Sequence, residues 1–238
     1  MKETIKKKNY FLIIFFLLIF GSFLRTYNVN YNDLWSDEMV SFWVADPSLS
    51  FGETFYRIFS SNWMVLFEFC LKYFHIMFGY DVNISRYFSV TISIASLVAF
   101  TALLNQISNR KSVIFGLFIL SINIYHLGFS IELRSYIFSF FFVILFIYLA
   151  FKKSFFDSNF KTNLFILNIT LVLMLLCHPF TLLVVGSYIV YRCLDAIKNK
   201  NFNKDNFNKI FSLILTTILF LIFYFQTTLK IIDPNALS

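Results

Sequence analysis

Acidic and basic side chains at three separate places in the chain could together carry out a group transfer. Asp37 and Glu38 are adjacent carboxylates that follow the first apolar segment, Glu132 and Arg134 share a short polar stretch, and His178 stands in another. A carboxylate can take the proton of an incoming hydroxyl or amine. A guanidinium can hold a phosphate with two parallel hydrogen bonds. The set is therefore suited to transfer of a group from a phosphate-bearing donor, which is lipid-linked if the chain lies in a membrane.

The segments between these residues are apolar enough to lie in a membrane. Hydrophobic residues make up 58% of the chain, aromatic residues 21%, and the mean hydropathy is +0.72. The apolar runs are continuous rather than alternating, which favours helices over a barrel, because backbone groups in lipid must bond within their own segment. We expect an all-α, polytopic helical membrane protein with about seven transmembrane helices, at residues 10–24, 86–107, 112–129, 136–151, 164–177, 180–192 and 211–229.

The distribution of basic residues predicts the orientation. Of the 20 Lys and Arg residues, 14 precede the first span or lie near the loops after the second, fourth and sixth spans. Basic loops stay in the cytoplasm, so we expect a multi-pass protein of the cell's inner (cytoplasmic) membrane with a cytoplasmic N-terminus. The other loops, at residues 25–85, 130–135 and 178–179, then gather all five side chains named above on the extracytoplasmic face.

The first extracytoplasmic loop, residues 25–85, is long enough to hold structure of its own. Pro47 is predicted to end one short helix, and Ser50-Phe51-Gly52-Glu53 is a capping box that opens another. We therefore expect two or three juxtamembrane helices in this loop.

Residues 63–79 within that loop are apolar enough to be mistaken for a span. Glu68, Lys72 and His75 are spaced by four and three residues, so they share one helix face. A polar stripe on an apolar helix is typical of a helix that lies in the membrane interface. A true span with a Glu68–Lys72 pair facing the bundle also fits the residues, but it would reverse the sidedness of every later loop.

Several short motifs occur in an order that resembles one family. They are Leu24-Arg25-Thr26-Tyr27, Trp35-Ser36-Asp37-Glu38, Phe78-Gly79-Tyr80, Ser85-Arg86-Tyr87-Phe88-Ser89, Ser130-Ile131-Glu132-Leu133-Arg134-Ser135-Tyr136 and His178. Together they resemble the GT-C membrane glycosyltransferases, in the PMT-like branch of protein O-mannosyltransferases and lipid A aminoarabinose transferases. The resemblance covers about residues 10–190.

The resemblance implies a hexosyl- or pentosyltransferase that uses a polyprenyl-phosphate-linked sugar donor and works on the extracytoplasmic face with inversion at the sugar. It implies that Asp37 is the general base or positions the acceptor, that Glu38 supports it, and that Glu132 is the second catalytic acid. Arg134 would contact the donor phosphate. The remaining predicted substrate-binding residues are Trp35, Tyr136 and His178.

The chain departs from the branch in three respects. The proline-rich start of the helix at 63–79 is replaced by Asn62-Trp63-Met64, and Ile131 stands where glutamine is usual. The branch also has a longer C-terminal half, so residues 1–238 are expected to form a single GT-C-like domain that is incomplete at its C-terminus. A truncated, inactive remnant or a partner subunit of such an enzyme is therefore an alternative.

A transporter of lipid-linked sugars is also compatible with the apolar segments, although its spans would be expected to carry charges near their middle. A solvated loop is an alternative interpretation of the acidic pair, and a local ion pair near a helix end is an alternative interpretation of Glu132 with Arg134. No cofactor is predicted, although the carboxylates are compatible with a divalent cation. The expected partners are the lipid-linked donor, a glycan, lipid or protein acceptor, and membrane lipids, but no nucleic acid.

Overall fold

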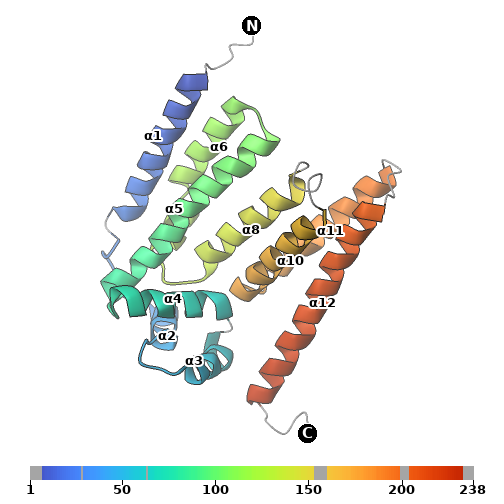
Figure 1. Cartoon of the computed structure of the whole chain (residues 1–238). Coiled ribbons are helices and arrows are strands. Elements are labelled where there is room, and N and C mark those ends of the chain that lie inside the picture. The colour runs from blue at the N-terminus through green and yellow to red at the C-terminus, as the bar shows by residue number, and fades with distance from the viewer. Residues whose placement is uncertain (1–6, 28, 63, 153–159, 199–203, 233–238) are drawn as a thin grey trace.

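The structure is a computed structural model that describes residues 7–27, 29–62, 64–152, 160–198 and 204–232. Within these residues all regular elements are helical (Figure 1). Long helices form a bundle, and a group of short helices covers one end of it. The bundle helices are α1 (Lys7–Thr26), α5 (Val82–Ile107), α6 (Arg110–Ile122), α7 (Ile124–Ile131), α8 (Tyr136–Phe151), α10 (Phe160–Cys177), α11 (Thr181–Lys198) and α12 (Lys204–Ile232).

Within the described residues, four helices are long and apolar enough to cross a membrane. They are α1, α5, α10 and the segment Phe207–Thr228 of α12, and the bent pair α6–α7 brings the number to five. Helix α8 has 16 residues, or about 24 Å, against a hydrocarbon core of about 30 Å. Helix α11 carries Arg192, Asp195 and Lys198 in its last turns. An all-helical, membrane-embedded protein is therefore supported, while spans at 136–151 and 180–192 stay predictions.

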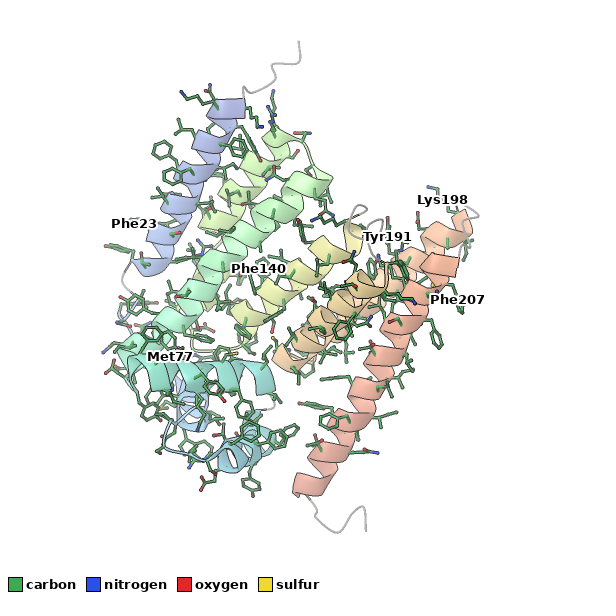
Figure 2. All side chains as sticks on the ribbon, in the orientation of Figure 1. Phe23, Met77, Phe140, Tyr191, Lys198 and Phe207 are labelled. Carbon is green, nitrogen blue, oxygen red and sulfur yellow. The ribbon has the colours of Figure 1, made fainter. Side chains whose placement is uncertain are left out.

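The surface of the bundle fits this environment. Phe23 on α1 and Phe207 on α12 are 58% and 67% exposed, and both point away from the bundle (Figure 2). Apolar patches of this extent are unusual on proteins surrounded by water, so the exposed aromatic side chains are suited to contact lipid.

The segment expected to form one span at 112–129 is divided into two helices. Helices α6 and α7 meet at Asn123 with a bend of 54°. The Asn123 side chain accepts a hydrogen bond from the backbone N–H of His126 at 2.9 Å, which caps the start of α7 in the usual way for asparagine. The cap competes with continuation of α6 and redirects the chain toward the loop that carries Glu132.

The helices alternate in direction, so the bundle has two distinct ends (Figure 1). At one end α1, α6, α10 and α12 begin, and α5, α8 and α11 stop; we call it the basic end. The described basic residues there include Lys7, Lys8, Arg110, Lys111, Lys152, Lys161 and Lys198. At the other, which we call the site end, α1 and α10 stop and α5, α8 and α11 begin. This separation agrees with the expected distribution of loops.

Lys209, which precedes the span expected at 211–229, is part of a helix rather than a loop. It lies on α12, is 5% exposed, and donates through Nζ to the carbonyl oxygen of Ala150 at 2.9 Å. The ammonium group thus binds a carbonyl at the C-terminal end of α8, where a cation also interacts favourably with the helix dipole.

Short helices cover the site end, as expected for the first long loop. They are α2 (Ser36–Val44), α3 (Phe51–Arg57), the π-helical turn η1 (Ile58–Asn62) and α4 (Val65–Phe78). The predicted capping box is confirmed: Ser50 Oγ accepts from the Glu53 N–H, and Glu53 Oε2 accepts from the Ser50 N–H. Helix α4 lies across the ends of the bundle helices (Figure 1) and packs Phe67 and Leu71 against them.

The polar face of α4 is not in contact with water, unlike that of a typical interfacial helix. Glu68, Lys72 and His75 are 0%, 7% and 1% exposed. They face α2 and α3, and Lys72 Nζ donates to the carbonyl oxygens of Asp46 and Leu49. The spacing identified a shared face correctly, but that face binds the covering helices, because a loop folded over α4 supplies the polar partners that water would otherwise supply.

Candidate functional site

The acidic pair lies in the first turn of α2, at the site end. Helix α2 begins at Ser36, so Asp37 and Glu38 stand where backbone N–H groups and the helix dipole favour negative charge. The two side chains differ in environment. The Glu38 side chain is 3% exposed and the Asp37 side chain 47%. Glu38 is therefore a buried charge that needs partners, whereas Asp37 remains accessible.

Glu38 joins three parts of the chain. Its Oε1 accepts a hydrogen bond from the backbone N–H of Leu133 at 2.7 Å, in the loop between α7 and α8. Its Oε2 accepts from the N–H of Trp35 at 3.3 Å and lies 3.4 Å from Nη2 of Arg86 on α5. The carboxylate thus holds the loop containing Glu132 and Arg134 against α2.

Arg86 was not predicted as a site residue, yet it organises the loop before α2. It is 4% exposed and its guanidinium donates to three carbonyl oxygens, those of Val29 (3.2 Å), Asn32 (2.6 Å) and Asp33 (3.2 Å). A cation at the start of an apolar helix must find partners when it is buried. An arginine at the start of an apolar helix therefore indicates a polar contact, and this pattern in the sequence could have identified Arg86 as a site residue.

Arg134 and Asp37 form the second contact between the two predicted motifs. Arg134 Nη2 lies 3.4 Å from Asp37 Oδ2, and Nη1 donates to the Asp37 carbonyl oxygen at 3.2 Å. The guanidinium carbon is 5.8 Å from the centre of the Tyr136 ring. The structure therefore brings together the acidic pair and the Glu132–Arg134 loop, which are about 95 residues apart in the chain.

A cavity of about 440 Å³, which we call the acidic cavity, opens beside these contacts. Its polar lining includes Glu38, Glu132 and Arg86, and the ring of Trp35 forms part of its wall. Burial and the nearby charge of Glu38 raise the pKa of Glu132, and the charge of Arg134 partly opposes that shift. Glu132 is therefore better suited to accept a proton near neutral pH than an ordinary surface glutamate.

Tyr136 and His178 line a different cavity, of about 480 Å³, which we call the apolar groove. Their rings lie 5.7 Å apart. His178 Nδ1 accepts a hydrogen bond from the N–H of Phe180 at 3.2 Å. Burial and the charge of Arg134 lower the pKa of His178, which keeps the ring neutral. The predicted site residues are thus divided. Trp35, Glu38 and Glu132 line the acidic cavity and Tyr136 and His178 line the apolar groove, whereas Asp37 and Arg134 line neither and contact each other.

Among the described residues, no three His, Cys, Asp or Glu side chains stand close enough together to hold a metal ion. Carboxylates, the guanidinium groups of Arg86 and Arg134, and aromatic rings gather at the site end. Comparison of the chain with protein-family models, with curated proteins and with solved structures finds no match.

Proposed function

We propose that this chain is a membrane glycosyltransferase that moves a sugar from a polyprenyl-phosphate donor to an acceptor on the extracytoplasmic face, with inversion. The observation that supports it most is the acidic cavity, where Glu38 and Glu132 share a space with the ring of Trp35. A carboxylate such as that of Glu132, which can bind hydroxyl groups, and an aromatic face that packs on a sugar ring are suited to hold a carbohydrate. The ordered motifs of the chain agree with this assignment.

The contacts support different roles for the acidic residues in the proposed reaction. The oxygens of Glu38 are occupied by Leu133, Trp35 and Arg86, so Glu38 positions the loop rather than touching the acceptor. Asp37 and Glu132 remain as general bases for the attacking hydroxyl or amine. The guanidinium of Arg134 binds the phosphate that leaves with the lipid. In an inverting displacement the base and the leaving group lie on opposite faces of the sugar. Asp37 on α2 and Arg134 in the loop before α8 come from separate elements, whereas Glu132 shares its loop with Arg134.

The proposal is tested by comparing Asp37→Asn and Glu132→Gln. The purified full-length chain in proteoliposomes is given polyprenyl-phosphate mannose or polyprenyl-phosphate aminoarabinose together with a membrane extract as the source of acceptors. Release of polyprenyl phosphate is measured. The variant that removes the base should lose at least about a hundredfold in rate, a typical contribution of general base catalysis.

Asp81→Asn is the matched control, because it removes a carboxylate at the site end while asparagine still caps α5. This variant should retain the wild-type rate. No release by the wild-type chain with either donor, or equal rates for the wild type and both acidic variants, would overturn the proposal.

A further inference from the structure

The apolar groove lies between the α6–α7 bend, α8 and α11, apart from the acidic cavity. Leu120, Phe140 and Val184 are among its apolar walls, and no Lys, Arg, Asp or Glu among the described residues lines it. Tyr125 and Phe180 at its rim are each 75% exposed, so the groove opens to the surface of the bundle. One lining residue, His126, is 6% exposed and stands out because its hydrogen bonding is incomplete.

Arg25 on α1 determines the protonation state of the His126 ring. Arg25 is fully buried and all five of its N–H groups are used. Nε donates to Ser93 Oγ, and the terminal nitrogens donate to three carbonyl oxygens and to His126 Nδ1, the last at 2.7 Å. A guanidinium has donors only. The Nδ1 atom of His126 must therefore be the acceptor in this contact.

The proton of the neutral His126 ring is then fixed on Nε2. A protonated ring would place an N–H group at Nδ1 directly against the N–H groups of Arg25, so the ring is neutral. The Nε2 atom is buried and has no hydrogen-bond partner among the described residues. A buried donor without a partner is unfavourable. This donor belongs to a residue that lines the groove, and the Nε2 atom itself is covered by neighbouring atoms that must move before a ligand reaches it.

We propose that the apolar groove binds one ester-linked acyl chain of a bilayer lipid, whose ester carbonyl oxygen accepts a hydrogen bond from Nε2 of His126. The walls match a hydrocarbon chain, and the donor matches a single uncharged acceptor. An anionic phosphate fits less well, because the described lining contains no cation to neutralise it. His126 also lies on α7, five residues before its end at Ile131, so the donor lies toward the site end, as an ester group near the membrane boundary requires.

Two substitutions of His126 distinguish the acceptor role of Nδ1 from the donor role of Nε2. The amide oxygen of asparagine can replace Nδ1 as the acceptor for Arg25 but offers no donor at the Nε2 position. Glutamine places its amide group near Nε2 and can donate there. His126→Asn should therefore lose recognition of the ester while retaining the fold, and His126→Gln should retain part of that recognition.

The probes are diacyl phosphatidylglycerol and its dialkyl ether analogue, each with a photoreactive diazirine in one chain. The purified full-length chain in nanodiscs is irradiated with each probe, and labelled peptides from α8 and α11 are quantified by mass spectrometry. We expect the wild type to be labelled about three to ten times more by the ester than by the ether, the range of one hydrogen bond. For His126→Asn we expect no preference, with wild-type thermal melting.

Filling the groove is the second test. Val184→Trp should abolish labelling of both peptides, whereas Leu183→Trp, on the same helix but 71% exposed, should not. Equal labelling of the wild type by ester and ether would overturn the proposal. So would stronger labelling of these peptides by a diazirine-bearing polyprenyl phosphate, which would assign the groove to a phosphate-bearing lipid. Because transfer activity is not measured, these results are independent of the proposed function.

Discussion

Glu38 is the residue on which the geometry of the site end depends. Its two oxygens bind a loop that lies far away in the chain, the residue before α2, and a cation on α5. A buried carboxylate is stable only with such partners. The same charge also acts on Glu132 through space, because it raises the pKa of that residue. Glu38 therefore sets both the position and the proton affinity of a candidate base.

The first prediction concerns pH. Since the pKa of Glu132 is raised, the carboxylate that accepts a proton is lost as pH falls through a value above the usual glutamate pKa of about 4.3. If Glu132 is the base, the transfer rate should decrease on the acid side from that raised value downward. The measurement is the rate of polyprenyl phosphate release against pH.

Glu38→Gln tests the cause of this shift. Glutamine retains an oxygen that can accept from the Leu133 N–H but removes the negative charge, so the acid limb of the profile should move to lower pH. An unchanged limb in this variant would contradict the role of Glu38, and an unchanged profile in Glu132→Gln would exclude Glu132 as the base.

The gathering of the site residues could be predicted from the sequence, whereas their detailed partners could not. Alternating spans and basic loops are enough to place Asp37 and Arg134 on one face. The role of Arg86 depends on carbonyl oxygens of an irregular loop, and no periodic pattern encodes where such a loop lies. Asn123 is a residue type that caps helices, but an asparagine within an apolar run is equally compatible with an unbroken span.

At the scale of elements, the two faces of α4 make different contacts. Its apolar face packs on the bundle, and its polar face binds α2 and α3. Hydrophobic spacing identifies both faces, but it does not distinguish a polar face in water from one covered by another segment. The covering segment is decided by tertiary contacts, which explains why the burial of Glu68 and Lys72 was not expected.

The second prediction concerns the attachment of α2 and α3 to α4. Lys72 Nζ donates to the carbonyl oxygens of Asp46 and Leu49 and to Thr54 Oγ1, at 2.9, 2.6 and 2.9 Å. Lys72→Met removes the donor that these three acceptors share and should lower the free energy of unfolding by about 2 kcal/mol. Hydrogen exchange should increase in α2 and α3 first.

Tyr73→Phe is the control for this variant, since Tyr73 is the neighbouring residue and is 58% exposed. It should leave exchange unchanged. Wild-type exchange rates in Lys72→Met would show that α2 and α3 are held by other contacts.

The third prediction concerns the close approach of α1 to α5 and α6. A Cβ atom on Gly21 would lie 2.7 Å from Leu97 Cδ1 and 2.9 Å from Ser121 Oγ. Gly21→Val should therefore force the helices apart and destabilise the protein by about 1–3 kcal/mol, the usual cost of overpacking. Thermal melting in detergent measures the change.

Gly186 on α11 provides the comparison, because a Cβ atom there would have no neighbour within 4 Å. Gly186→Val should melt close to the wild type. If the two variants melted at the same temperature, the tight packing of α1 would not contribute to stability.

At the scale of the whole molecule, the two ends of the bundle differ in charge and in covering elements (Figure 1). The described lysine and arginine side chains at the starts of α1 and α6 lie at the end opposite α2, α3 and α4. This arrangement is compatible with a basic end in the cytoplasm. The orientation is open to direct measurement.

The fourth prediction therefore concerns labelling from outside the cell. In a chain with Cys70, Cys177 and Cys193 replaced by alanine, Gly52→Cys should react with a membrane-impermeant maleimide in intact cells. Lys111→Cys should react only after the membrane is permeabilised. Both positions are exposed, so access to the reagent decides the outcome. The reverse pattern would place the site end in the cytoplasm.

The contact between Glu38 and Leu133 has a consequence for biosynthesis. The two residues are 95 positions apart, so at about 5–20 residues per second the ribosome needs about 5–20 s to deliver the partner of the carboxylate after the carboxylate itself. During that interval α2 cannot settle in its final place. In nascent chains arrested before Leu133, α2 should therefore be cleaved by protease. In chains released after synthesis of α8 it should be protected, so the rate of translation would limit the rate at which the site end folds.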